Sequence, residues 1–189
     1  SPIYVGLGFA PIGLIGSKLF FNISLFQIHY ISDPWDIEVF SASIGQAKSD
    51  KEFANSRHFT ARFSSKYSFM HIFDTGSVSA GPMLGMEYVQ FTSLPAKKKL
   101  GTLESKYTDL TTGGLFYGFA LSETFTLNKD RKFKITQMFY KQSYSVRDAG
   151  HDWKFVPQAD EPTPTILDGG ENEDEISKST VFQIEFAYL

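Results

Sequence analysis

The chain contains no cysteine among its 189 residues, which excludes disulfides, thiolate metal sites and cysteine nucleophiles. It also offers no apolar run long enough for a membrane-spanning helix. The uncharged residues 2–16 fall short of the ~20 residues that such a helix needs, and glycine and proline interrupt them. Because the chain does not open with Met and a basic segment, we expect that any targeting peptide has already been removed.

An excess of positive charge is missing as well. The formal net charge is −3, so no basic field exists that would attract nucleic acid, and we expect no nucleic-acid partner. With 42% hydrophobic and 21% charged residues, the composition suits a soluble protein and a water-lined membrane barrel equally. Composition alone therefore does not choose between these two classes.

Aromatic residues are abundant, at 16% of the chain with 19 Phe and 9 Tyr, and they favour β-strands and membrane interfaces. Apolar and polar side chains alternate with a period of two, as in a strand with two different faces. In the clearest segment, Phe59, Phe63 and Tyr67 oppose Arg62 and Lys66. The alternating segments are residues 3–10, 21–30, 37–46, 59–69, 78–88, 114–127, 132–136 and 182–188.

Some segments depart from this alternation. The phase slips at Leu25 and Phe26, which predicts a β-bulge. Alternation predicts that Val78 points outward with the apolar residues of its strand, and Glu123 falls on the same apolar parity as its own neighbours. The seventh segment loses its alternation around residues 138–140.

The connections between the segments alternate in length, as in an up-and-down barrel with a short-turn end and a long-loop end. Short turns are expected at residues 33–36, 74–76 and 128–131, and longer connections at residues 11–18, 47–57, 92–107 and 147–177. Both termini then lie at the short-turn end. We expect a single domain over residues 1–189, with a mobile acidic loop at about residues 158–176.

These features predict an all-β fold, an eight-stranded antiparallel up-and-down transmembrane barrel with its apolar face toward lipid. The pattern resembles the small outer-membrane barrels of Gram-negative bacteria, the OmpX-like, OmpW-like and OmpA-type proteins. The alternating, aromatic-rich residues 181–189 are similar to the last strand that the outer-membrane assembly machinery recognises in that family. The resemblance implies an integral, monomeric outer-membrane protein with periplasmic turns and extracellular loops.

Charged residues on the polar parity point to a network inside the barrel, because buried charges must be paired. We expect them to form a structural plug, with the selectivity lining of a narrow channel as the alternative. Small inward residues leave a second alternative, a lumen that binds a small hydrophobic ligand. The predicted network comprises Glu38, Arg62, Lys66, Glu87, Lys134 and Glu185.

Outside the lumen, three lysines, Lys97, Lys98 and Lys99, form either a solvated loop tip or a contact to lipopolysaccharide phosphate. We interpret Trp35, Trp153 and Tyr188 as interfacial anchors. The acidic run at residues 171–175 lacks the ligand order of a calcium loop, so we expect no metal site, and we expect no cofactor.

Two features of the sequence are compatible with an enzyme. Residues 73–77 (Phe-Asp-Thr-Gly-Ser) resemble an aspartic-protease motif, but that mechanism needs a second carboxylate motif and a tight turn suits the sequence better. A barrel that modifies lipid A would need a rim histidine, for which His58 beside Ser56 is the candidate, without an evident acid partner. We interpret the scattered histidines His29, His58, His71 and His151 as ordinary polar surface residues. We expect a non-enzymatic role, either structural or in surface interactions through the extracellular loops.

A soluble, lipocalin-type ligand-binding barrel is the last alternative. Such a protein would direct its apolar residues inward, and this sequence lacks that family's early Gly-x-Trp motif and final helix. The direction of the apolar face therefore discriminates between the two kinds of barrel.

Overall fold

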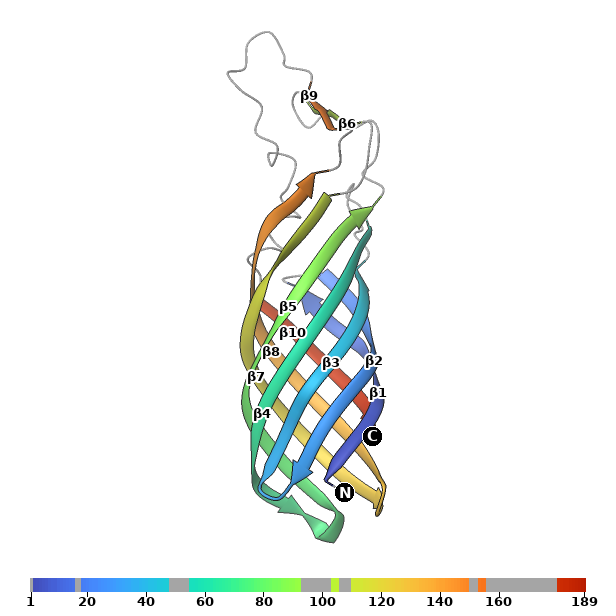
Figure 1. Cartoon of the computed structure of the whole chain (residues 1–189), viewed down its shortest axis with the longest axis vertical. Coiled ribbons are helices and arrows are strands. Elements are labelled where there is room, and N and C mark those ends of the chain that lie inside the picture. Colours follow the sequence, from blue (N-terminus) through green and yellow to red (C-terminus); the bar gives the residue numbers. More distant parts are fainter. Residues whose placement is uncertain are drawn as a thin grey trace.

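A computed structural model shows the chain as a closed barrel (Figure 1). The structure describes residues 2–15, 18–47, 55–92, 103–105, 110–149, 153–155 and 180–189. Neighbouring barrel strands are antiparallel, in the cyclic order β1-β10-β8-β7-β5-β4-β3-β2. Their bounds are β1 (Ile3–Ile15), β2 (Lys18–Ser32), β3 (Trp35–Ala47), β4 (Asn55–Ile72), β5 (Gly76–Thr92), β7 (Leu110–Asn128), β8 (Arg131–Ala149) and β10 (Thr180–Tyr188).

The barrel is closed by the pairing of its first and last strands. The register of β1 and β10 runs from Leu7 opposite Tyr188 to Ile15 opposite Val181. Closure matters because an open sheet edge would leave unpaired backbone groups, which hydrocarbon cannot satisfy. The predicted eight-stranded up-and-down fold is therefore confirmed. A separate two-stranded pair consists of β6 (Leu103–Ser105) and β9 (Trp153–Phe155).

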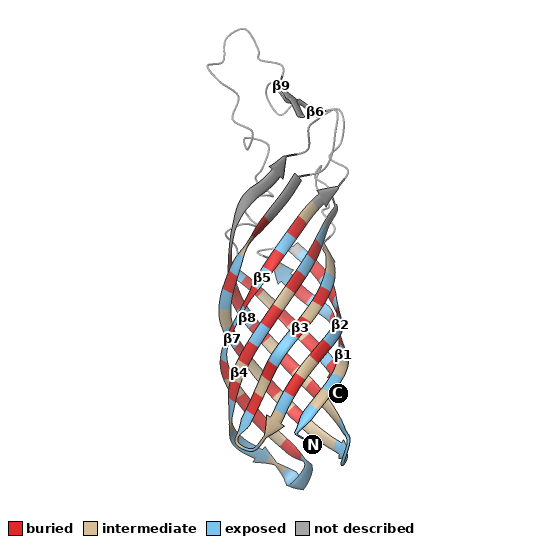
Figure 2. Ribbon diagram, in the orientation of Figure 1, coloured by how far each residue is buried: buried red, intermediate tan, exposed pale blue. Residues whose placement is uncertain are grey.

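Buried and exposed residues alternate along the described parts of the barrel strands (Figure 2). The exposed outer side chains are mostly apolar, and most of the buried inner ones are polar. On β4, Phe63 and Tyr67 are exposed on the outside, whereas Arg62 and Lys66 are only 5% and 1% exposed. A lipocalin-type barrel would bury its large apolar side chains, so the observed direction is opposite to that alternative. Among the described residues, no helix is long or apolar enough to cross a membrane.

The first hairpin differs from the sequence-based prediction. A long connection was expected at residues 11–18, but β1 continues to Ile15 and β2 begins at Lys18. Pro11 lies where the register shifts on both sides, between Phe9 and Ile12 toward β10 and between Ala10 and Gly13 toward β2. A residue without an N–H is tolerated at such an irregularity, so this proline marks a bulge within the strand and does not start a loop.

Of the two irregularities predicted in β2 and β8, the structure confirms the first and not the second. The slip predicted in β2 is confirmed, because the pairing with β3 skips between Ser24 and Phe26 and both Leu25 and Phe26 are exposed. The loss of alternation predicted for β8 is wrong: Met138 and Tyr140 continue the inward row, and Phe139 faces outward. These inward side chains are apolar or amphipathic, so hydrophobicity did not report their direction.

Val78 and Glu123 lie opposite each other in the β5–β7 pair. Val78 is 6% exposed, so its predicted outward direction is wrong, and it lies opposite Met70 beside a register shift in β4. Glu123 is half-buried and pairs with Val78 and Ile135 near the short-turn end, away from the middle of the barrel wall.

The short turns and both termini lie at one end of the barrel (Figure 1). The described turns are residues 33–34, the 3-10 turn η1 (Phe73–Thr75) and residues 129–130. At the opposite end, β3 and β4, β5 and β7, and β8 and β10 are joined by the longer connections, most of which lie outside the described residues, as does the acidic segment at residues 158–176.

Candidate functional site

The barrel interior gathers every member of the predicted charge network. Their side chains all lie inside the barrel wall and are between 1% and 5% exposed. They form three clusters along the barrel, each fixed by strand alternation, which turns the same parity of β3, β4, β5, β8 and β10 inward. These residues are Glu38, Arg62, Lys66, Glu87, Lys134 and Glu185.

The central cluster is built around one guanidinium. Arg62 donates from Nε to Glu38 Oε1 at 2.6 Å and from Nη2 to Glu38 Oε2 at 2.8 Å. The same Nη2 donates to Glu185 Oε1 at 2.9 Å, although β4 and β10 lie on opposite walls of the barrel. Gln27 Nε2 donates to the same Oε1 of Glu185 at 2.8 Å, and Ser24 Oγ donates to Glu185 Oε2 at 2.5 Å. Arginine suits this role because its planar fork binds carboxylates in a bidentate manner.

The cluster nearest the short turns is built around Asp36. Lys134 Nζ donates to Asp36 Oδ1 at 2.7 Å, which again joins opposite walls, β8 and β3. Ser79 Oγ donates to Asp36 Oδ2 at 3.1 Å, and Lys66 Nζ lies 3.5 Å from the same oxygen. Asp36 falls in the turn predicted at residues 33–36, but it belongs to β3 and its side chain is buried in the lumen. Its two-residue spacing from Glu38 on one strand is the sequence signal that would have predicted this position.

The cluster nearest the long loops contains a histidine–carboxylate pair. His58 Nδ1 hydrogen-bonds Glu87 Oε1, and Gln142 Nε2 donates to Glu87 Oε2 at 2.8 Å. The interpretation of His58 as a histidine without an acid partner is therefore wrong. It shares the inward parity of Thr60 and Arg62 and is 1% exposed, so it does not lie on the outer rim, where a lipid would be modified.

The other histidines divide between the interior and the surface. His29 is buried, also against expectation, with Nδ1 3.2 Å from Lys134 Nζ and Nε2 3.1 Å from Gln27 Oε1. His71 is exposed near the short turns, as expected, and its side chain is 66% accessible. His151 lies outside the described residues.

Charges in the described lumen nearly cancel. The buried acids are Asp36, Glu38, Glu87 and Glu185, and the buried bases are Arg62, Lys66 and Lys134. Each acid accepts a hydrogen bond from, or shares one with, a cation, an amide or an imidazole. A selective channel needs a lining of one predominant sign, whereas mutually paired charges have the arrangement of a plug.

The inward glycines make room for aromatic rings of the chain itself. A side chain at Gly85 would collide with the ring of Phe116, and one at Gly118 would collide with Tyr140. These two rings pack together with their centroids 4.6 Å apart. The space that the sequence analysis offered to a small hydrophobic ligand is thus occupied at this level by Phe116 and Tyr140.

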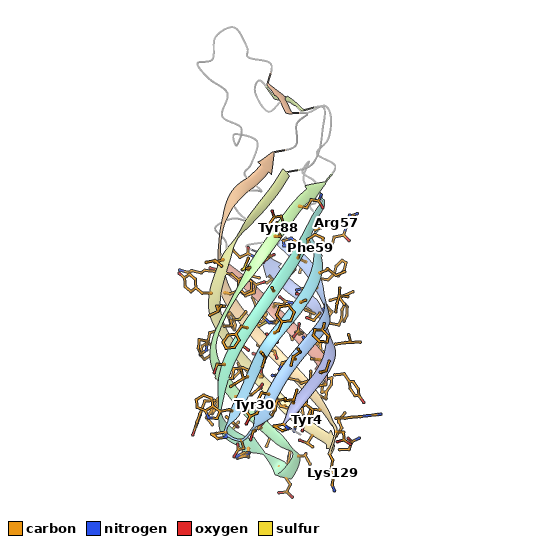
Figure 3. The ribbon with its side chains drawn as sticks, viewed as in Figure 1. Tyr4, Tyr30, Arg57, Phe59, Tyr88 and Lys129 are labelled. Carbon is orange, nitrogen blue, oxygen red and sulfur yellow. The ribbon has the colours of Figure 1, made fainter. Side chains whose placement is uncertain are left out.

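The predicted interfacial anchors whose side chains the structure describes lie near the short-turn end of the barrel. Trp35 and Tyr188 are exposed near the short turns, and Trp35 meets Tyr67 edge-on at 5.5 Å. Figure 3 shows aromatic side chains at both ends of the wall, with Tyr4 and Tyr30 near the short turns and Phe59 and Tyr88 near the long loops. Lys97, Lys98, Lys99 and the side chain of Trp153 lie outside the described residues.

The motif at residues 73–77 lies at a short turn of the barrel. Asp74 lies in η1 (Phe73–Thr75) between β4 and β5 and is exposed, which confirms the interpretation of this motif as a turn. Within the described ranges, no group of three His, Asp or Glu side chains could hold a metal ion.

Comparisons with known proteins agree with this architecture. No protein-family model and no curated protein sequence matches the chain. Among solved structures, Neisserial surface protein A (NspA) is 10% identical with a TM-score of 0.61, over 100% of this chain and 96% of that one. OprG, an outer membrane protein from Pseudomonas aeruginosa, is 12% identical with a TM-score of 0.45, over 98% and 93%. Its closed eight-stranded topology and its likeness to NspA show that the chain has the fold of the small eight-stranded outer-membrane barrels, as its sequence pattern predicted.

Proposed function

We propose that this protein is an integral outer-membrane barrel with a closed lumen, and that it acts without enzymatic activity through its surface and its long-loop end. The observation that carries the proposal is the pair of bridges across the lumen, Arg62 to Glu185 and Lys134 to Asp36. Both join strands from opposite walls, so charged side chains cross the barrel axis at two levels.

The outer face supports insertion into a bilayer. On β4, exposed aromatic residues run from Phe59 through Phe63 to Tyr67. The span from Phe59 to Tyr67 is about 27 Å along the strand, or about 20 Å along the membrane normal at a tilt of ~40°. Outer-membrane barrels carry an apolar band about 25 Å tall, so these two residues fit its upper and lower edges.

The size of the barrel supports a closed lumen. Eight strands enclose a space that side chains can fill. The largest fully buried side chains are inward ones, among them Lys66, Phe116, Lys134 and Met138. A continuous water path would have to pass both ion-pair levels and these side chains.

Conductance of the full-length protein in planar bilayers tests the proposal. We expect insertion, reported by heat-modifiable gel mobility, without steady conductance. Replacing Arg62 and Glu185 together by Ser should raise conductance, whereas Arg131→Ala, an exposed change at a short turn, should not. Steady conductance of the unmodified protein would contradict the closed lumen. A chain that stayed soluble without detergent would contradict the membrane location.

A further inference from the structure

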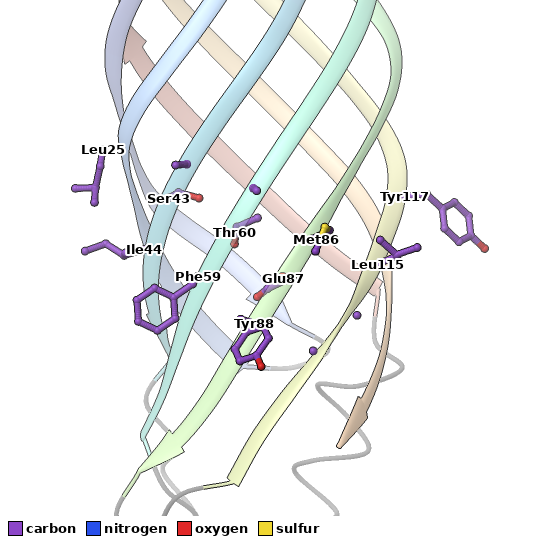
Figure 4. A pocket seen from close by; sticks show the side chains of 14 residues that line it. Leu25, Ser43, Ile44, Phe59, Thr60, Met86, Glu87, Tyr88, Leu115 and Tyr117 are labelled. Atoms are coloured by element: carbon purple, nitrogen blue, oxygen red, sulfur yellow. The ribbon is translucent and has the colours of Figure 1, made fainter. Parts of the chain in front are cut away.

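The outer wall of the barrel carries two adjoining apolar grooves near the long-loop end. The larger has a volume of about 1100 Å³ and crosses β3, β4, β5 and β7. Its floor includes Ala42 and Ala61, which are paired across β3 and β4. Figure 4 shows lining residues such as Leu25, Ile44 and Tyr117 pointing away from the barrel. The groove is therefore open toward the membrane, and its lining also includes Ser43, Thr60 and Glu87, whose side chains are buried on the inner side of the wall.

A second groove lies beside the first and shares one wall with it. It has a volume of about 310 Å³ and is lined by Phe21, Ile23, Gln46 and Arg57, among others. Ile44 and Phe59 line both grooves and are paired across β3 and β4, so they form a ridge between them. Two apolar grooves separated by a ridge fit a lipid with several acyl chains better than they fit a lipid with one acyl chain.

Polar groups stand directly above the ridge. Arg57 is paired with Gln46 on β3 and Gln90 on β5, and its outward parity is that of Phe59. Its side chain is exposed, and Figure 3 places it above Phe59 at the long-loop end. If Phe59 marks the edge of the apolar band, this guanidinium lies at headgroup depth. A guanidinium binds phosphate in a bidentate manner, and the flanking amides can hydrogen-bond sugar hydroxyls.

We propose that this surface, Arg57 with the two grooves below it, binds the lipid A part of lipopolysaccharide, with a phosphate at Arg57 and acyl chains in the grooves. The proposal rests on the proposed outer-membrane location, since lipid A is the phosphorylated, multiply acylated lipid of the outer leaflet. It differs from the sequence-based prediction of a lipopolysaccharide contact at Lys97, Lys98 and Lys99, which lie outside the described residues.

Native mass spectrometry of the full chain, released from detergent micelles that contain equimolar lipid A and phosphatidylglycerol, tests the proposal. We expect lipid A to be retained in preference to phosphatidylglycerol. Arg57→Ala should lower retention about tenfold, as expected for loss of a charge-assisted hydrogen bond. Ala61→Phe, which fills the larger groove, should also lower it; if that variant does not fold, Ala42→Phe fills the same groove from β3.

The matched controls use the same exchanges elsewhere. Ala80→Phe enlarges a β5 residue that pairs with Tyr67 and Leu121, away from both grooves, and Arg131→Ala removes an exposed arginine at a short turn. Neither should change retention. A variant with Lys97, Lys98 and Lys99 all replaced by Ala should retain lipid A as well as the unmodified protein.

Several results would overturn the site. These are equal retention of both lipids, unchanged retention in Arg57→Ala, or a loss of retention only in the triple lysine variant. A different result would show that the grooves bind a second copy of the chain: the unmodified protein would run as a dimer in gel filtration, and a groove variant would run as a monomer with unchanged lipid binding. If the proposed membrane location were wrong, the unmodified chain would not insert into vesicles at all, and this result is distinguishable from those above. Insertion without lipid A retention refutes this site alone.

Discussion

Arg62 is the residue on which the described interior depends most. One guanidinium satisfies two carboxylates that belong to β3 and β10, and it also lies 2.9 Å from the sulfur of Met138. Removing one partner of a buried charge cluster leaves the others desolvated and unpaired, which costs more than the net value of the pair itself.

We therefore expect Arg62→Ala to leave an assembled but less stable barrel, with a loss of about 3–5 kcal/mol in the free energy of unfolding. Urea unfolding in lipid vesicles measures it. A variant that also carries Glu38→Gln and Glu185→Gln removes the orphaned charges and should recover much of the loss. If that variant were no more stable than Arg62→Ala, the ion pairs would not explain the effect.

Phe63, the next residue on β4, faces the other way. It is 39% exposed on the outer wall, paired with Leu84. Phe63→Arg should block assembly, since a cation at mid-membrane costs about 2–4 kcal/mol, whereas Phe59→Arg near the upper edge should cost about 0–1 kcal/mol. Heat-modifiable mobility after refolding into vesicles reports both variants. Equal tolerance of Phe63→Arg and Phe59→Arg would mean that Phe63 does not lie in hydrocarbon.

At the scale of the strands, glycines determine how closely neighbouring strands can approach each other. A Cβ at Gly118 would collide with backbone atoms of Phe139 and Tyr140 on β8, which cannot move without opening the sheet. At Gly8 on β1, the nearest atom would instead be the end of the Gln27 side chain, at 2.6 Å. The two positions therefore differ in whether the neighbour can give way.

Gly118→Ala should destabilise the barrel by about 1–3 kcal/mol, the usual cost of overpacking. Gly8→Ala should cost less because the amide of Gln27 can turn aside. Urea midpoints measured in the same vesicles compare the two variants. A larger effect at Gly8 would show that the hydrogen bond from Gln27 to Glu185 matters more than strand separation.

For the whole molecule, the acidic connection before β10 should be separable from the barrel. Residues 160–175 lie outside the described residues, and their sequence offers little apolar surface to bury. Loop-closure entropy changes slowly with length, so we expect the deletion to leave insertion and thermal resistance intact.

Gel mobility before and after heating measures the effect of this deletion. A variant in which a Gly/Ser linker of equal length replaces residues 160–175 separates the effect of length from that of charge. Loss of assembly in both variants would show that the segment contributes contacts to the barrel.

The sequence by itself determined the strands, their faces and the closed architecture. A strand has a side-chain period of two, and a bilayer demands one apolar face. The directions of residues such as Phe63 and Arg62 can therefore be predicted from the neighbouring sequence alone. The inward position of the predicted charges followed from the same parity. Where an inward residue is apolar, as at Met138, or a proline lies at a bulge, as at Pro11, the local signal was misleading.

Only the tertiary structure decided which inward groups meet. Arg62 and Glu185 are 123 residues apart in sequence, and their contact depends on the closure and stagger of the barrel, which place β4 opposite β10. The pairing of His58 with Glu87 and the recruitment of Asp36 depend on register in the same way. Alternation fixes the side on which a residue lies, but its height along the barrel comes from bulges and strand offsets, and both coordinates must match before two side chains can bond.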